Sequence, residues 1–153
     1  MNLPVHLLEN QTDFDRVMDA LASAHWIGFD TEFVGEKYYI PGSILSADTD
    51  NKIPAAWGMP AKSDIYFDRS PVFKISTEAI TNGKIKPILW FSNTAALRSG
   101  WAWGQAYLRD GITAFEAEVG KGKLYAFGPE ITFRAQTHGT FKLLFNQLYG
   151  HSE

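Results

Sequence analysis

The stretch from Gly111 to Gly150 constrains the fold of this 153-residue chain more than any other part of its sequence. Two apolar-rich runs, 112–119 and 124–127, flank a short turn that contains two glycines. This pattern is typical of a β-hairpin. The second run is apolar at consecutive positions, which predicts a strand covered on both faces. Gly128-Pro129 ends this run, because proline cannot donate to a strand ladder.

We expect a helix after the hairpin. Thr137 is its predicted N-cap, and Gly150 suits the position just past its C-terminus. Four apolar residues fall at helical spacing on one face of this segment and predict its buried side: Phe141, Leu144, Phe145 and Leu148. The hairpin, the covered strand and the helix together predict an α/β protein, with a mixed β-sheet flanked by helices.

Composition indicates one globular domain with an aromatic-rich core. Apolar residues make up 45% of the chain and charged residues 20%. The net charge of -3 gives no electrostatic footprint for nucleic acid. The absence of cysteine excludes disulfides, thiolate metal sites and a cysteine nucleophile. The chain shows neither a signal peptide nor an apolar run long enough to span a membrane, which predicts a soluble, cytoplasmic protein.

An acidic pair follows an expected strand near the N-terminus. A helical face over 13–24 precedes the apolar run 26–29, and Asp30 and Glu32 come directly after that run. Two carboxylates two positions apart on a strand point to the same side, and together they can hold a divalent metal through oxygen. The pair also fits surface acids at the end of a strand.

The segment from Leu7 to Pro41, with FDTEF at 29–33 and YYIP at 38–41, resembles the opening of ribonuclease D and related DEDD 3′–5′ exonucleases. The resemblance implies that Asp30 and Glu32 bind magnesium or manganese, which activates water. The family's further aspartate motifs are missing, and the nearest candidate, 107–110, is one residue too short. A nuclease remnant that binds nucleic acid is therefore an alternative function.

Residues 41–150 resemble the C-terminal, glutamine-amidotransferase-like region of bacterial proteins in the zinc carboxypeptidase family. Six blocks in the same order carry the resemblance: PGSIL, IPAAWGMP, YFDRSPVF, SGWAWG, GKGKLYAFG and FRAQTHGTFKLLFN. It implies flavodoxin- or amidotransferase-like layers downstream of a peptidase domain. The peptidase zinc ligands are not in this region, and amidotransfer requires a cysteine nucleophile that the chain lacks. The resemblance thus favours a domain without catalysis.

Two further groups are candidate binding residues. Glu130, Arg134 and His138 follow the Gly128-Pro129 turn and are candidates for a small-ligand site, although His138 also fits a local hydrogen-bonding role. Trp57, Trp101 and Trp103 could stack on a base or a sugar. The glycines beside these tryptophans favour packing between sheet and loops instead.

Together the resemblances predict a chimeric chain, with a ribonuclease D-like segment over 1–40 and a carboxypeptidase-associated region over 41–153. We expect the two to pack as one compact unit, since a half-sheet would expose apolar faces. The sequence leaves three origins open for such a junction: natural recombination, a gene-model artefact or engineering. The leading function is a non-catalytic accessory or interaction domain for which no cofactor is expected. Its partner is left open, and a protein is one option. The alternatives are the exonuclease remnant and a small-ligand-binding module.

Overall fold

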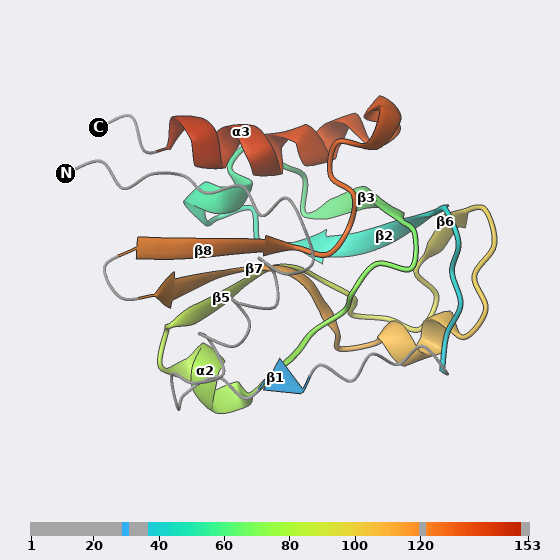
Figure 1. Ribbon diagram of the computed structural model, residues 1–153, viewed down its shortest axis with the longest axis horizontal. Coiled ribbons are helices and arrows are strands. Elements are labelled where there is room, and N and C mark those ends of the chain that lie inside the picture. The colour runs from blue at the N-terminus through green and yellow to red at the C-terminus, as the bar shows by residue number, and fades with distance from the viewer. Residues whose placement is uncertain (1–28, 31–36, 120–121, 151–153) are drawn as a thin grey trace, which may run out of the picture.

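A computed structural model describes residues 29–30, 37–119 and 122–150 of the chain. The fold is mainly β: a curled antiparallel sheet of six strands forms a half-barrel, and the C-terminal helix α3 (Phe141–Tyr149) lies along one side of it (Figure 1). Five strands form a continuous path in the order β3-β2-β5-β7-β8, and β6 pairs with β2 beside that path. Their bounds are β2 Ser43–Thr49, β3 Lys62–Phe67, β5 Ile85–Trp90, β6 Leu97–Ser99, β7 Ile112–Val119 and β8 Gly122–Phe127.

The remaining elements are short. Strands β1 (Phe29–Asp30) and β4 (Lys74–Ile75) form a separate antiparallel pair. Helix α2 (Thr77–Thr81) begins after Ser76, whose hydroxyl accepts a hydrogen bond from the Ala79 N–H. Four 3-10 turns complete the described part: η1 Pro54–Ala56, η2 Gln105–Leu108, η3 Phe133–Ala135 and η4 His138–Thr140.

The prediction of an α/β protein with flavodoxin- or amidotransferase-like layers is wrong. Every described strand pairing is antiparallel, whereas those layered folds are built on parallel strands joined through helices. Within the described residues only α3 exceeds five residues, so no set of helices covers both faces of the sheet. The sheet instead curls on itself and encloses much of its own core.

The predicted hairpin is confirmed, but its first strand, and not its second, is the one covered on both faces. Strands β7 and β8 pair antiparallel up to Val119 opposite Gly122. Strand β7 is buried at every position from Ile112 to Ala117, because β5 and β8 flank its edges and both of its faces are covered. Strand β8 ends the sheet, so its apolar residues 124–127 are only half-buried and the prediction of two covered faces is wrong.

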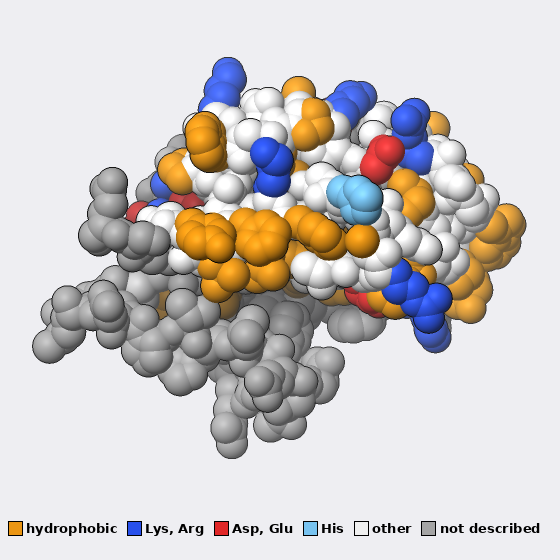
Figure 2. Space-filling view, turned by 90° about the horizontal axis from the view of Figure 1, so that it is seen from above, with side chains coloured by type: hydrophobic (Ala, Val, Ile, Leu, Met, Phe, Trp, Pro, Cys, Tyr) orange, Lys and Arg blue, Asp and Glu red, His pale blue; other side chains and the backbone are white. Residues whose placement is uncertain are grey.

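Helix α3 is present, but the prediction of its buried face is wrong. Leu143 is fully buried, whereas Phe145 and Leu148 are 46% and 49% exposed. The side-chain amide of Asn146 donates to the carbonyl oxygens of Ala55 and Trp57, and the amide of Gln147 donates to the Ala55 carbonyl oxygen. These amides hold the polar side of the helix against η1, and the apolar stripe therefore faces outward (Figure 2).

The predicted cap at Thr137 is also displaced. Its hydroxyl pairs with the Thr140 hydroxyl at 3.0 Å, and α3 begins four residues later at Phe141. Gly150 follows the last helical residue as predicted, and its N–H donates to the Asn146 carbonyl oxygen at 2.9 Å. None of the helices in the described ranges is long and apolar enough to cross a bilayer.

The core has two parts, and each contains a pair of packed phenylalanine rings among mostly aliphatic side chains. The larger part lies between the sheet, η1 and α3. The rings of Phe67 and Phe91 pack edge-on there, with their centroids 6.2 Å apart. The smaller part lies between β7, β5 and α2. The ring centroids of Phe73 and Phe115 are 5.3 Å apart there. Fully burying such a side chain stabilises a fold by about 1.5–3 kcal/mol.

Candidate functional site

Three large aromatic side chains are exposed on two segments that pair with each other, one just before β2 and the other in the loop after β6. Tyr39, Trp101 and Trp103 have exposed fractions of 47%, 56% and 53%, and we refer to them as the aromatic surface. Trp57, after η1, is 75% exposed. The prediction that the tryptophans fill the space between sheet and loops is therefore wrong. The loops carry these rings outward instead of folding them against the sheet.

The backbone fixes the rings of the aromatic surface relative to one another. Tyr39 and Trp103 form an antiparallel bridge in which each N–H donates to the other residue's carbonyl oxygen at 3.0 Å. Residues paired in this way carry their side chains on the same face. The Trp101 ring meets the Tyr39 ring edge-on, with centroids 6.1 Å apart and planes tilted by 65°. The three rings thus lie together on one surface.

A buried serine anchors the central tryptophan. The Ser43 hydroxyl donates to the Trp101 carbonyl oxygen at 2.6 Å and accepts from the Trp101 N–H at 3.0 Å. Ser43 is 1% exposed. Gly100, at φ +100, allows this approach, because a Cβ there would lie 2.6 Å from the Ser43 hydroxyl oxygen. Gly104, at φ +72, passes so close to the Lys37 carbonyl oxygen that a Cβ would collide with it. The loop is therefore closely packed against the fold.

The predicted small-ligand site at Glu130, Arg134 and His138 stays a prediction. Glu130 is exposed, and its backbone N–H donates to the Tyr66 carbonyl oxygen at 3.2 Å. The Arg134 guanidinium lies over the Phe133 ring at 5.1 Å. Of the three predicted residues, only His138 lines a cleft, which has a volume of about 480 Å³ and is bounded by β2, β3, β6 and the segment 136–139.

The predicted metal ligands stay a prediction. Asp30 ends β1, where its backbone lies opposite Lys74, and Glu32 lies outside the described residues. Within the described ranges, no group of three or more histidine, aspartate and glutamate side chains is close enough to hold a metal ion.

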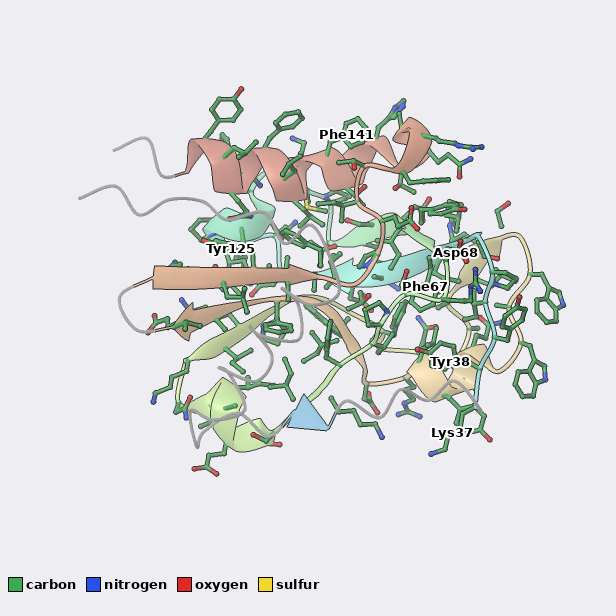
Figure 3. The ribbon with its side chains drawn as sticks, viewed as in Figure 1. Lys37, Tyr38, Phe67, Asp68, Tyr125 and Phe141 are labelled. Carbon is green, nitrogen blue, oxygen red and sulfur yellow. The ribbon has the colours of Figure 1, made fainter. Side chains whose placement is uncertain are left out.

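Two tyrosines and one carboxylate carry the main electrostatic features of the described interior. Burial raises the pKa of the Tyr38 phenol above its ordinary value of 10.0. Tyr38 lies against Phe67, with ring centroids 6.2 Å apart, while Lys37 lies at the surface (Figure 3). Burial, and then the nearby Glu116 carboxylate, raises the pKa of Tyr125. Neither phenol ionises near neutral pH, so both act as neutral packing groups.

The sequence interpretation missed Tyr39 and most of the cleft lining. Tyr39 stands in a segment whose only sequence signal is the family resemblance. The run KSDIYF at 62–67 alternates between outward and buried positions in the fold, with Lys62 and Asp64 outward. Its first three residues are all polar, so the sequence itself gives no alternating signal. Nothing in the sequence pairs that face with the distant segment 136–139.

No protein-family model matches the chain, and no curated protein and no solved structure matches it. The resemblances to ribonuclease D and to the carboxypeptidase-associated region therefore stay predictions.

Proposed function

We propose that this chain is a non-catalytic interaction domain that binds a partner protein through the aromatic surface. The observation that carries the proposal is that Tyr39, Trp101 and Trp103 are half exposed on a backbone held by a two-way bridge, a buried serine and two closely packed glycines. Rigid aromatic side chains give a large contact area and lose little conformational entropy on binding. Tryptophan and tyrosine are also the residues most enriched among those that dominate binding energy.

The size of the aromatic surface suits the centre of a protein interface. An aromatic side chain buries roughly 150–250 Å², so three half-exposed rings offer roughly 250–350 Å². A standard interface buries about 800 Å² per partner, with an apolar centre and a polar rim. The exposed Tyr107 and the exposed Arg109–Asp110 ion pair follow in the chain directly after this loop and supply residues for such a rim.

The ring geometry favours a protein over a sugar or a nucleic acid. Stacking on successive bases or sugars uses flat ring faces in a row. The Tyr39 and Trp101 planes are tilted by 65°, so these two rings present no common flat face. The net charge of -3 also disfavours a polyanionic partner.

The test uses Trp57 as a matched control, because it is a more exposed tryptophan on a different part of the chain. A photoreactive phenylalanine analogue is placed at Trp103 in one full-length variant and at Trp57 in another, and cross-linked proteins are compared in source cells. The protein captured only from position 103 is purified, and its affinity is measured by calorimetry. We expect Trp101→Ala and Trp103→Ala each to weaken binding at least about tenfold, and Trp57→Ala to leave it unchanged.

Two results would contradict this function. One is a purified partner whose affinity is the same for the wild type, Trp101→Ala and Trp103→Ala. The other is a neutral oligosaccharide that binds the wild type and fails to bind Trp103→Ala, which would make the aromatic surface a sugar site.

A further inference from the structure

The cleft beside His138 has a polar floor that follows from strand alternation. Ser43, Leu45, Ala47 and Thr49 of β2 are buried, so the residues between them face outward. Ser46 lies opposite Asp64 on β3, and Lys62 of the same strand faces outward two residues earlier. Arg98 of β6 adds a guanidinium from the other side of β2. Charged and hydroxyl side chains from three strands thus line one side of the cleft.

The opposite wall is the segment 136–139, which is held in place from both ends. Before it, Phe133 stacks on Tyr66 with centroids 4.4 Å apart and planes 19° apart. After it, the buried Thr140 hydroxyl oxygen lies 2.6 Å from the Ile131 carbonyl oxygen and 2.7 Å from the Thr137 carbonyl oxygen, and its single proton is shared between these two acceptors. The wall is therefore fixed before any ligand arrives.

Strained backbone leads directly into this wall. Arg134 and Ala135 have φ values of +45° and +54°, in the left-handed region that non-glycine residues rarely adopt. Two such residues in succession persist only where the surrounding contacts impose them, and strain of this kind concentrates at ligand sites. The ring stack of Phe133 on Tyr66 supplies the contact here.

The cleft holds more hydrogen-bond donors than acceptors. Arg98 contacts Asp64 through Nε, at 3.2 Å from Oδ1, and the Lys62 ammonium lies 3.8 Å from an Asp48 oxygen. Within the described part of the chain these are the only ion pairs of the two cations. At 3.8 Å the Lys62 ammonium makes no hydrogen bond to Asp48, and no contact among the described residues engages the Arg98 Nη groups, so both cations can donate to a ligand. Ser46, Gln136 and His138 add a hydroxyl, an amide and an imidazole along the same lining.

We infer that this cleft binds a small hydroxylated molecule that carries a phosphate group. Arg98 and Lys62 approach from different strands and can engage separate oxygens of one phosphate, for which a guanidinium fork and an ammonium are well suited. Ser46, Gln136 and His138 then bind the hydroxyl groups. The volume of about 480 Å³ falls within the range of small-molecule sites. No residue of the cleft lining belongs to the aromatic surface, so this inference does not depend on the function of that surface.

Gly139 provides a variant that blocks the cleft without disturbing the fold. It lines the cleft, its φ lies outside the left-handed region, and a Cβ there would meet no atom within 4 Å. Gly139→Glu adds both bulk and negative charge to the cleft, whereas Gly139→Ala is the matched control. Asp64→Asn removes the carboxylate that competes for Arg98 and keeps the shape of the side chain.

The experiment is a calorimetric titration of the full chain with inorganic phosphate, glucose 6-phosphate and gluconate, with the His138 imidazole protons followed by NMR. We expect glucose 6-phosphate to bind more tightly than phosphate or gluconate and to shift the His138 signals, which are assigned with a His138→Gln variant. Arg98→Gln should weaken this binding about tenfold, as expected for a charge-assisted bond. Gly139→Glu should abolish it, Gly139→Ala should leave it unchanged, and Asp64→Asn should strengthen it.

Thermal unfolding of each variant separates lost binding from lost structure. The inference is overturned if neither phosphate-bearing probe binds at millimolar concentration, or if gluconate binds as tightly as glucose 6-phosphate. It is also overturned if Asp64→Asn weakens binding, since that result would assign the ligand contact to the carboxylate.

Discussion

Replacing Ser43 with alanine tests whether the buried serine holds the aromatic surface in place. The hydroxyl makes two hydrogen bonds to the backbone of Trp101, at 2.6 Å and 3.0 Å. Each such bond contributes about 0.5–1.5 kcal/mol net, which gives about 1–3 kcal/mol for the pair. Because Trp101 is 56% exposed, water can replace part of what the backbone loses. We therefore expect Ser43→Ala to lower the free energy of unfolding by about 1–2 kcal/mol.

Urea unfolding followed by far-UV circular dichroism measures this change, and a thermal scan should show a Tm lower by about 3–6 °C. Ser46→Ala is the matched control, because Ser46 is on the same strand and faces outward. That substitution should change stability by less than about 0.5 kcal/mol. Ser43→Ala should also weaken partner binding although it removes no ring. Equal stability of the two variants would refute the assignment of Ser43 as an anchor.

Three further predictions concern the interior. Thr113 is fully buried, and its hydroxyl has no hydrogen-bond partner in the described part of the chain. Thr113→Val should therefore raise the free energy of unfolding, measured in urea, by about 1 kcal/mol. A loss of stability of that size would contradict the buried environment. The Glu116 carboxylate lies 3.3 Å from the Lys86 ammonium and 3.5 Å from that of Lys123, so Glu116→Gln should lower stability by about 1 kcal/mol. The difference should shrink at 1 M salt; a salt-independent difference would argue for packing alone. Burial raises the pKa of Tyr38 above 10.0, so above that pH the unfolded chain releases the phenol proton more readily than the folded chain. Stability should fall as pH rises beyond about 10, and Tyr38→Phe should move the midpoint of alkaline unfolding upward; an unmoved midpoint would assign the loss to other groups.

The sequence predicted those elements whose signal is local. The β7–β8 hairpin followed from two apolar runs around a glycine-bearing turn, and Gly150 marked the end of α3. The order of the strands in the sheet had no such local signal. Strand β7 packs between β5 and β8, so the less continuous of the two hairpin runs became the covered one. The α/β prediction failed because it extended one helix into whole layers.

The outward face of α3 shows why the candidate surfaces were harder to predict. Helical periodicity identifies an apolar stripe but not what it packs against. Here Asn146 and Gln147 bind carbonyl oxygens near η1, and these tertiary contacts fix which side of the helix faces inward. The same limit applied to Trp101 and Trp103, whose exposure depends on contacts with Ser43 and Tyr39 far away in the chain. His138 was identified, but its partners in the cleft come from strands distant in sequence.

The bridge between Tyr39 and Trp103 has a consequence for the order of folding. Ser43 and Trp101, which anchor the same surface, are 58 positions apart, and β3 and β5 lie between them in the chain. Contacts across such a long loop form only after the loop entropy has been offset by the strands within it. We therefore expect the three rings to come together only after β2, β3, β5 and β6 have assembled. A partner that recognises these rings would bind the folded domain and would not bind a nascent or locally unfolded chain.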